Sequence, residues 1–129
     1  MSISWLPPKN IPGILRQYEI GLKDQSTKSP VTGFPKTYGN STISVTYTDL
    51  QAFTDYSLEL TATTIHKSLP YIHHFKTPES IPGPPMNVQA VSINEGKIIS
   101  VRWEPPQFPN GNITNYKVRK TLFSTSRYQ

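Results

Sequence analysis

The chain of 129 residues contains no cysteine, which excludes a disulfide framework, a thiolate metal site and a cysteine nucleophile. Alanine occurs only three times, against 32 β-branched Ile, Val and Thr residues, a balance that disfavours helices. Charged residues make up 16%, against about 25% in an average protein, and no apolar run approaches the roughly 20 residues that span a bilayer. The composition excludes a charge-rich disordered chain and indicates a β protein whose stability comes from packing.

Proline is abundant, and part of it belongs to an internal repeat. Residues 2–8 read Ser-Ile-Ser-Trp-Leu-Pro-Pro, and residues 100–106 read Ser-Val-Arg-Trp-Glu-Pro-Pro, at an offset of 98 residues. The same offset relates Gly13 to Gly111 and Ile20 to Val118. A period this long exceeds the roughly 20–50 residues of solenoid repeats and is typical of tandem domains of about 100 residues. The sequence therefore predicts parts of two copies of one fold.

A proline-rich segment separates the two copies. Residues 78–85 contain four prolines and one glycine, and proline lacks the N–H group that a central strand requires. We expect residues 1–77 to form one domain and residues 78–85 a short, stiff linker. Residues 86–121 should form a partial second domain, followed by a tail of unclear structure at 122–129.

Alternation of apolar and polar residues marks the strands. The clearest runs, with turn-forming clusters between them, cover residues 3–5, 18–22, 43–47, 56–62 and 99–103. Short alternating strands separated by turns are typical of a two-sheet sandwich.

Several segments resemble the fibronectin type III family. Residues 82–90 are similar to the proline-rich entry into its strand A, and residues 101–106 to its strand B with a core Trp followed by Pro-Pro. Residues 110–118 resemble its B–C loop and strand C. Residues 50–56 stand where the family has a tyrosine corner, with Ala52 in place of the usual proline. The resemblance covers nearly the whole chain and implies an all-β, immunoglobulin-like two-sheet sandwich, with one nearly complete copy and a truncated second copy.

The resemblance also implies which residues pack in the core. Aromatic rings can fill the space between two sheets, and a buried tyrosine can cap a backbone group at the corner between strands E and F. These structural core markers are Trp5, Tyr18, Leu50, Tyr56, Trp103 and Tyr116.

The family pattern implies that both copies are incomplete. Residues 2–77 are expected to run from strand B to strand G, with strand G over 71–77 and no strand A before them. The second copy is expected to contain strands A, B and C over 86–93, 97–104 and 113–121, without strands E, F and G. Such a short copy should be marginally stable alone, and the unpaired edge of the first copy invites strand addition or dimerisation.

Sequence motifs for catalysis are absent. The chain contains no His-Glu-x-x-His, no Gly-x-Ser-x-Gly and no glycine-rich phosphate loop. His73 and His74 are neighbours on a predicted strand, so they point to opposite faces and cannot easily share one ion. His66 could join one of them, but a surface or edge position is the favoured interpretation. We expect no enzyme activity, no metal and no cofactor in this chain.

The net charge of +5 makes nucleic acid an alternative partner. Lys117, Arg119 and Lys120 cluster near Arg127, but no set of aromatic side chains for base stacking lies among them. We therefore expect no nucleic-acid binding and no membrane insertion within this chain, while weak binding of a polyanion such as a sulfated glycan stays open.

Two glycosylation sequons are present, at Asn40 and Asn112, both in predicted turns. They favour an exported chain. Residues 1–5 lack the basic and apolar regions of a signal peptide, so we expect any export signal to lie outside this sequence. The family is commonly found in receptor and adhesion ectodomains, which implies an extracellular location as part of a membrane-anchored or secreted parent. A cytoplasmic location is the alternative.

These features predict a non-catalytic spacer and protein-protein interaction module from a tandem array, in a receptor or adhesion ectodomain. Its partner would be a protein or a neighbouring fibronectin type III domain. An intracellular scaffold or a muscle-type structural module is the alternative. Binding residues in a sandwich are expected on the loops at its ends. The candidates in the B–C and F–G loops are Lys9, Asn10, Ile11, His66, Lys67, Ser68 and Leu69, and those at the linker are Ile81 and Met86.

Overall fold

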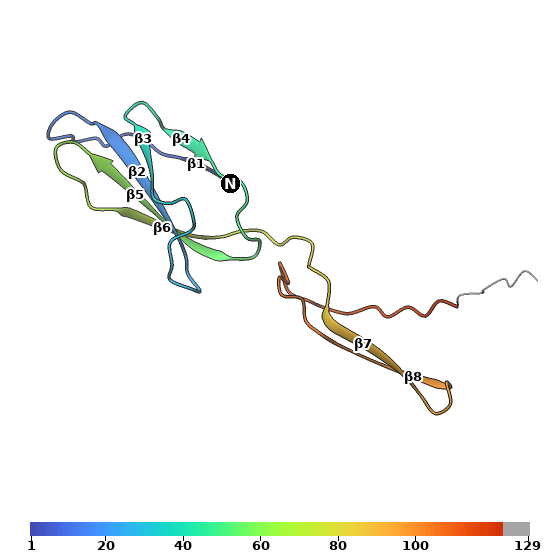
Figure 1. The fold of residues 1–129 in the computed structure, drawn as a ribbon. Coiled ribbons are helices and arrows are strands. Elements are labelled where there is room, and N and C mark those ends of the chain that lie inside the picture. The colour runs from blue at the N-terminus through green and yellow to red at the C-terminus, as the bar shows by residue number, and fades with distance from the viewer. Residues whose placement is uncertain (123–129) are drawn as a thin grey trace, which may run out of the picture.

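The computed structural model describes residues 1–122, which form strands and no helix (Figure 1). We call residues 1–77 the N-terminal unit and residues 86–122 the C-terminal unit. The N-terminal unit contains β1 (Ser2–Ser4), β2 (Gln17–Asp24), β3 (Lys36–Gly39), β4 (Ser44–Thr46), β5 (Asp55–Thr63) and β6 (Tyr71–Lys76). The C-terminal unit contains β7 (Met86–Ile93) and β8 (Ile98–Glu104). The predicted all-β class is confirmed.

The N-terminal unit is built from two antiparallel sheets. One sheet has the order β3-β2-β5-β6, and the other pairs β1 with β4. β2 and β5 pair along their whole lengths, from Gln17 opposite Thr63 to Asp24 opposite Tyr56. Ile3 of β1 and Val45 of β4 pack against the buried residues of the larger sheet, so the two sheets enclose one core between them.

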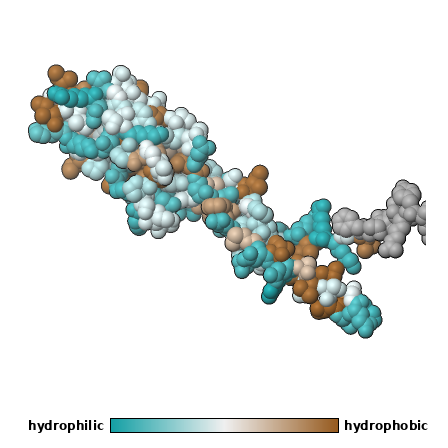
Figure 2. Space-filling model, viewed as in Figure 1, coloured by the Kyte–Doolittle hydropathy of each residue, from teal (hydrophilic) through white to brown (hydrophobic). Residues whose placement is uncertain are grey.

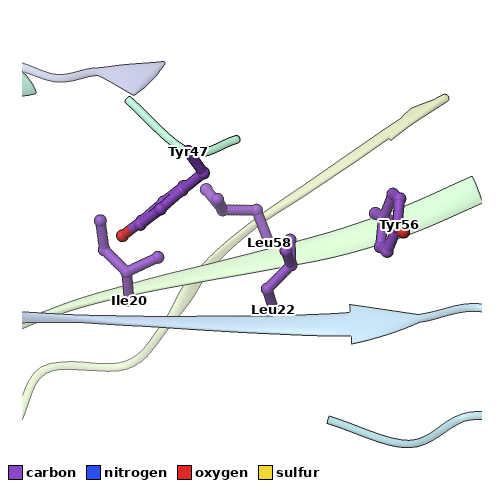
Figure 3. Close-up of a cluster of buried hydrophobic side chains, with 5 residues drawn as sticks. All are labelled: Ile20, Leu22, Tyr47, Tyr56 and Leu58. Carbon is purple, nitrogen blue, oxygen red and sulfur yellow. The ribbon is translucent and has the colours of Figure 1, made fainter. Parts of the chain in front are cut away.

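Alternation along β2 creates this core. Tyr18, Ile20 and Leu22 are almost completely buried, while the residues between them are only partly covered. Figure 3 shows Ile20, Leu22, Leu58 and Tyr47 close together and Tyr56 further along the same core, and all five are buried. The Tyr47 hydroxyl lies 2.7 Å from the Tyr38 hydroxyl, and burial, reinforced by this hydrogen bond, raises the pKa of Tyr47. At one end of the core, Trp5 packs edge-on against Tyr18 with the ring centroids 5.3 Å apart.

The C-terminal unit is a hairpin of β7 and β8 with little buried surface. Its apolar side chains, including Val88, Val91 and Ile99, are about half exposed. Trp103 contacts the ring of Tyr116 at 5.4 Å between centroids. The strands over residues 86–93 and 97–104 thus occupy the expected positions, with β8 one residue shorter.

The strand predicted over residues 113–121 is absent, and that prediction was wrong. The backbone there makes no ladder with another strand. In the N-terminal unit the equivalent strand, β2, pairs with β3 and β5. Residues 86–122 contain no strand that could take either place, so the alternating residues 116–120 have no partner for their backbone groups. Of the predicted tail at 122–129, residues 123–129 lie outside the described part of the chain.

A tight turn follows β2 and gives a prediction for the pH dependence of stability. The hydroxyl and the backbone N–H of Ser26 both donate to Asp24 Oδ1, at 2.6 and 2.7 Å. These bonds, first that from the hydroxyl, lower the pKa of Asp24 below its ordinary value of 3.8. The stabilisation is therefore complete above the unfolded-state pKa and disappears as the pH falls through the lower folded-state value.

We expect Asp24→Asn to lower the midpoint of thermal unfolding by about 1–3 °C at neutral pH, because the turn loses charge-assisted hydrogen bonds. The difference from the parent should vanish in strong acid, where Asp24 is protonated in both states. Calorimetry across the acid range checks this, with Asp49→Asn as the control for loss of one negative charge. A difference in unfolding midpoint that persists unchanged into strong acid would contradict a stabilising role of the charged Asp24 carboxylate.

Candidate partner-binding loops and the joint between the units

The predicted B–C and F–G loops lie side by side at the end of the N-terminal unit that faces away from the linker (Figure 1). The B–C loop covers residues 5–16, and the F–G loop covers residues 64–70. Arg16 N donates to Thr63 O at 2.8 Å, which fixes the end of one loop against the start of the other. The α-carbon of Gly13 faces Thr64 so closely that an added Cβ would lie 3.6 Å from the threonine Cβ. The two loops therefore form one surface.

Exposed apolar side chains gather on this surface. Leu69 is 92% exposed and Leu6 is 87% exposed, and two isoleucines in the same loops, Ile14 and Ile65, are nearly as open. Figure 2 shows apolar surface at this end of the molecule, next to hydrophilic surface. Single exposed apolar residues are ordinary, but four in two adjoining loops are typical of a contact surface.

The charge of the loop surface has one sign. Lys9, Arg16 and Lys67 are exposed, and neither loop contains an acidic residue. Lys67 pairs with Glu19 of β2 at 2.7 Å. Within residues 1–122, Lys9 and Arg16 have no carboxylate at ion-pair distance. The surface thus combines apolar groups with two uncompensated positive charges.

The seven residues predicted for these loops have different environments. Ser68 supports the loop itself, because its hydroxyl accepts from Ala62 N at 3.0 Å and donates to Leu69 O at 2.9 Å. Lys67 is held by its ion pair, and Ile11 is only 37% exposed. The other four residues are exposed as well: Lys9, Asn10, His66 and Leu69.

The sequence-based prediction missed Leu6, Ile14 and Ile65. All three are apolar residues inside segments rich in turn-forming or polar residues, where the period-2 pattern is interrupted. An interruption of the strand alternation is the only signal in the sequence, and it does not separate them from Val31, Phe34 and Leu50, which also lie outside strands but pack against the core.

The opposite end of the N-terminal unit carries a partly buried turn and the contact with the C-terminal unit. Gln51 N donates to the hydroxyl of Tyr56, which is 4% exposed, at 3.1 Å. Thr77 Oγ1 donates to Gln51 O at 2.7 Å. The Gln51 side chain then reaches Asn110 of the C-terminal unit, with 2.6 Å between Nε2 and Oδ1. We call the contact among Gln51, residues 78–83 and residues 108–111 the joint.

The remaining candidates lie apart from the loop surface. Lys117, Arg119 and Lys120 line an open groove of about 870 Å³ that also contains Trp103 and Tyr116, whereas Arg127 lies outside the described residues. Ile81 is exposed at the joint and Met86 begins β7. Among residues 1–122, no group of three or more His, Cys, Asp or Glu side chains could hold a metal ion.

The two sequons differ in their surroundings. Asn40 Nδ2 donates to Leu15 O at 3.0 Å, which connects the turn after β3 to the B–C loop. Asn112 is exposed, and its side chain forms no hydrogen bond within the described part of the chain. Its amide nitrogen is therefore the more accessible of the two.

Two facing antiparallel sheets, a Trp–Tyr contact in the core and a tyrosine hydroxyl that caps a turn define an immunoglobulin-like sandwich. No helix in residues 1–122 has the length and apolar character needed to cross a membrane. No family model matches the chain.

Curated proteins do match it. The chain is 32% identical over 126 residues to neural cell adhesion molecule L1.1 of Danio rerio, which covers 88% of this chain and 10% of the relative. It is 32% identical over 122 residues to phosphatidylinositol phosphatase PTPRQ of Homo sapiens, and this match covers 92% of this chain and 5% of the relative. It is 39% identical over 83 residues to protein sidekick homolog of Caenorhabditis elegans, and this match covers 60% of this chain and 3% of the relative. The chain thus spans between 3% and 10% of the length of these relatives.

These relatives confirm the resemblance to the fibronectin type III family, because they contain ectodomain arrays of fibronectin type III and immunoglobulin-like domains. They are cell-adhesion or receptor ectodomain proteins. The catalytic domain of the relative named as a phosphatase lies outside the matched region.

Proposed function

We propose that this chain is a non-catalytic spacer and protein-protein interaction module from a tandem fibronectin type III array, in the extracellular part of an adhesion or receptor protein. In this proposal residues 1–77 are one domain, residues 78–85 are the linker, and residues 86–121 are the beginning of the next domain. The partner is another protein, which binds at the B–C and F–G loops of the N-terminal unit.

The main support for this proposal is the set of exposed apolar side chains on the loop surface. Leu6, Ile14, Ile65 and Leu69 are far more exposed than core residues of the same types, and covering them would gain free energy. Lys9 and Arg16 add a positive rim. A protein partner with apolar side chains and carboxylates would complement both features, and opposite charge at a rim mainly raises the association rate. Adhesion and receptor relatives support a protein as the partner.

Binding to intact cells tests the proposal. The double variant Ile65→Ser, Leu69→Ser should bind at least about 10-fold more weakly than the parent chain, because it removes two highly exposed apolar side chains from the F–G loop. Titration of fluorescent chain on cells that express adhesion proteins, read by flow cytometry, gives the apparent Kd. Both side chains are highly exposed, so the substitutions should leave the unfolding midpoint unchanged.

Ile81→Ser is the matched control, because Ile81 is 85% exposed but lies at the joint, away from the loops. The control should bind like the parent chain. An equal loss of affinity in the loop variant and in the control would contradict binding at the loops. Saturable binding with unchanged affinity in the loop variant would show that the partner contacts another surface.

Expression behind a signal peptide tests the extracellular location. We expect a glycan at Asn112, whose side chain is exposed and unengaged within residues 1–122. Glycosidase digestion should then increase the mobility of the secreted chain, and Asn112→Gln should remove that shift. Secreted chain without glycan at Asn112 or Asn40 would favour the intracellular alternative.

A further inference from the structure

A single side chain connects all three parts of the joint. Asn110 Oδ1 accepts from Gln51 Nε2 at 2.6 Å, and Asn110 Nδ2 donates to Ile81 O at 2.8 Å. Ser80 N donates to the backbone oxygen of Asn110 at 2.8 Å. The turn after β8 lies beside the linker in Figure 1. Asn110 therefore binds the N-terminal unit and the linker from its place in the C-terminal unit.

The groups that meet Asn110 are themselves held in place. Gln51 is fixed through its backbone to the Tyr56 hydroxyl and the Thr77 hydroxyl. The linker is fixed at its start, where Phe53 N donates to Pro78 O at 2.9 Å. Further along, Gly83 N donates to Phe108 O, also at 2.9 Å. The side chain of Asn110 thus joins segments that have little freedom of their own.

The backbone at Asn110 suits this position. Its φ is +53°, in the left-handed region that asparagine tolerates better than most residues. The next residue is glycine, and a Cβ at Gly111 would lie 3.1 Å from Glu79 Cδ, a contact tighter than nine in ten real Cβ contacts. The linker is therefore packed directly against the Asn110-Gly111 turn, with the Glu79 side chain beside it.

We propose that the two side-chain hydrogen bonds of Asn110, to Gln51 and to Ile81 O, fix the angle between the two units; we call this pair of bonds the clasp. Asn110 is also a deamidation site, and loss of its amide breaks the clasp. Asn110-Gly111 is the one Asn-Gly pair in the sequence. Glycine has no side chain to hinder its nitrogen, which attacks Asn110 Cγ and forms a succinimide while ammonia leaves. Water then opens the succinimide to aspartate or isoaspartate. The net reaction consumes one water and releases one ammonia.

The product cannot restore the clasp. A carboxylate in place of the amide presents an acceptor oxygen to Ile81 O, where the parent residue presents a donor. Two acceptors at that distance repel, and the Glu79 carboxylate near Gly111 adds repulsion of like charge. The side chain must turn away, which also removes Oδ1 from Gln51. Isoaspartate lengthens the main chain by one carbon and displaces Gly111 from the linker.

The closed clasp should also protect Asn110 from this reaction. Both atoms of its amide are hydrogen-bonded, and the attack on Cγ requires the side chain to rotate away from them. Deamidation of Asn110 thus reports how often the joint opens. Gln51→Ala removes one partner of the clasp from the other unit, so it should accelerate deamidation about threefold.

Spin labels at Thr37→Cys on β3 and Ser100→Cys on β8 measure the angle between the units, because the full chain has no other cysteine and both positions are exposed. Double electron–electron resonance should give a narrow distance distribution for the parent chain. Asn110→Asp should broaden it about twofold, because it loses the side-chain hydrogen bonds to Ile81 O and to Gln51 Nε2. Gln51→Ala should broaden it similarly.

Asn112→Asp is the matched control, since it makes the same chemical change two residues further along at an exposed side chain. It should leave the distribution narrow. An unchanged distribution in both Asn110→Asp and Gln51→Ala would overturn the clasp, as would equal broadening by Asn112→Asp. Peptide mass spectrometry after incubation in mild alkali gives the rate at Asn110, and a rate that Gln51→Ala does not raise would overturn the protective role. An unchanged thermal midpoint of the N-terminal unit excludes unfolding as the cause.

Discussion

Replacement of Ile20 by alanine should lower the free energy of unfolding by about 3–4 kcal/mol. Ile20 is completely buried at the centre of β2, in the same cluster as Leu58 of the neighbouring strand β5 and Tyr47, which follows β4 of the other sheet. The substitution removes three buried carbon atoms and leaves a cavity that two hydrogen-bonded sheets cannot close. A small domain has only about 5–15 kcal/mol in total, so the variant should be near its folding limit at body temperature. Urea denaturation followed by tryptophan fluorescence measures the change.

Ile72→Ala is the matched control for that variant. Ile72 lies on β6 opposite Glu59 and is 49% exposed, so the same chemical change should cost less than about 1 kcal/mol. Losses of similar size at Ile20 and Ile72 would contradict the assignment of the core between the two sheets.

Tyr56→Phe should destabilise the N-terminal unit by about 1–2 kcal/mol, although it deletes only one oxygen atom. The Tyr56 ring is buried and stacks near Phe75, so phenylalanine can fill its place. The hydroxyl is the acceptor for Gln51 N, and its loss leaves this N–H group without its partner in the turn. An unpaired donor beside the buried ring costs free energy to the extent that water cannot reach it, and this hydrogen bond is partly buried.

Tyr71→Phe removes the same atom from a side chain that is 65% exposed, and we expect its stability to stay within about 0.5 kcal/mol of the parent. Thermal and urea unfolding of both variants provide the comparison. Since Gln51 also reaches Asn110, Tyr56→Phe should in addition loosen the joint. Equal stability of Tyr56→Phe and the parent chain would show that the turn does not depend on this hydroxyl.

The sequence predicts strand positions correctly where the alternation of apolar residues coincides with a partner strand for the backbone. β7 covers residues 86–93 as predicted, because its partner β8 follows after a four-residue turn and the hairpin needs no distant contact. β2 shows its apolar alternation plainly, and β5 supplies a partner along its whole length. Residues 113–121 have a similar alternation, but a strand also needs a neighbour for its backbone groups. The pattern alone could not reveal that this neighbour is missing from residues 86–122.

The loop surface and the joint could be predicted only in part from the sequence. The loops that contain Lys9 and Leu69 could be located between strands, but their contact through Arg16 and Thr63 depends on the pairing of distant strands. Ile14 and Ile65 look like ordinary apolar residues until their exposure is known. The clasp at Asn110 was not predictable, because the sequence alone shows a turn there and gives no sign of Gln51, 59 residues earlier.

A scan of exposed side chains tests the proposed binding role most directly. Each exposed residue of the described chain is changed to serine, or to alanine where it is serine, and the variants are displayed and sorted for binding to the same cells. The proposal predicts that the losses cluster in the two loops, with Leu6, Ile14, Ile65 and Leu69 the most sensitive, followed by Lys9 and Arg16. Losses that cluster along β3, or in the groove beside Trp103, while the loops tolerate substitution would contradict it.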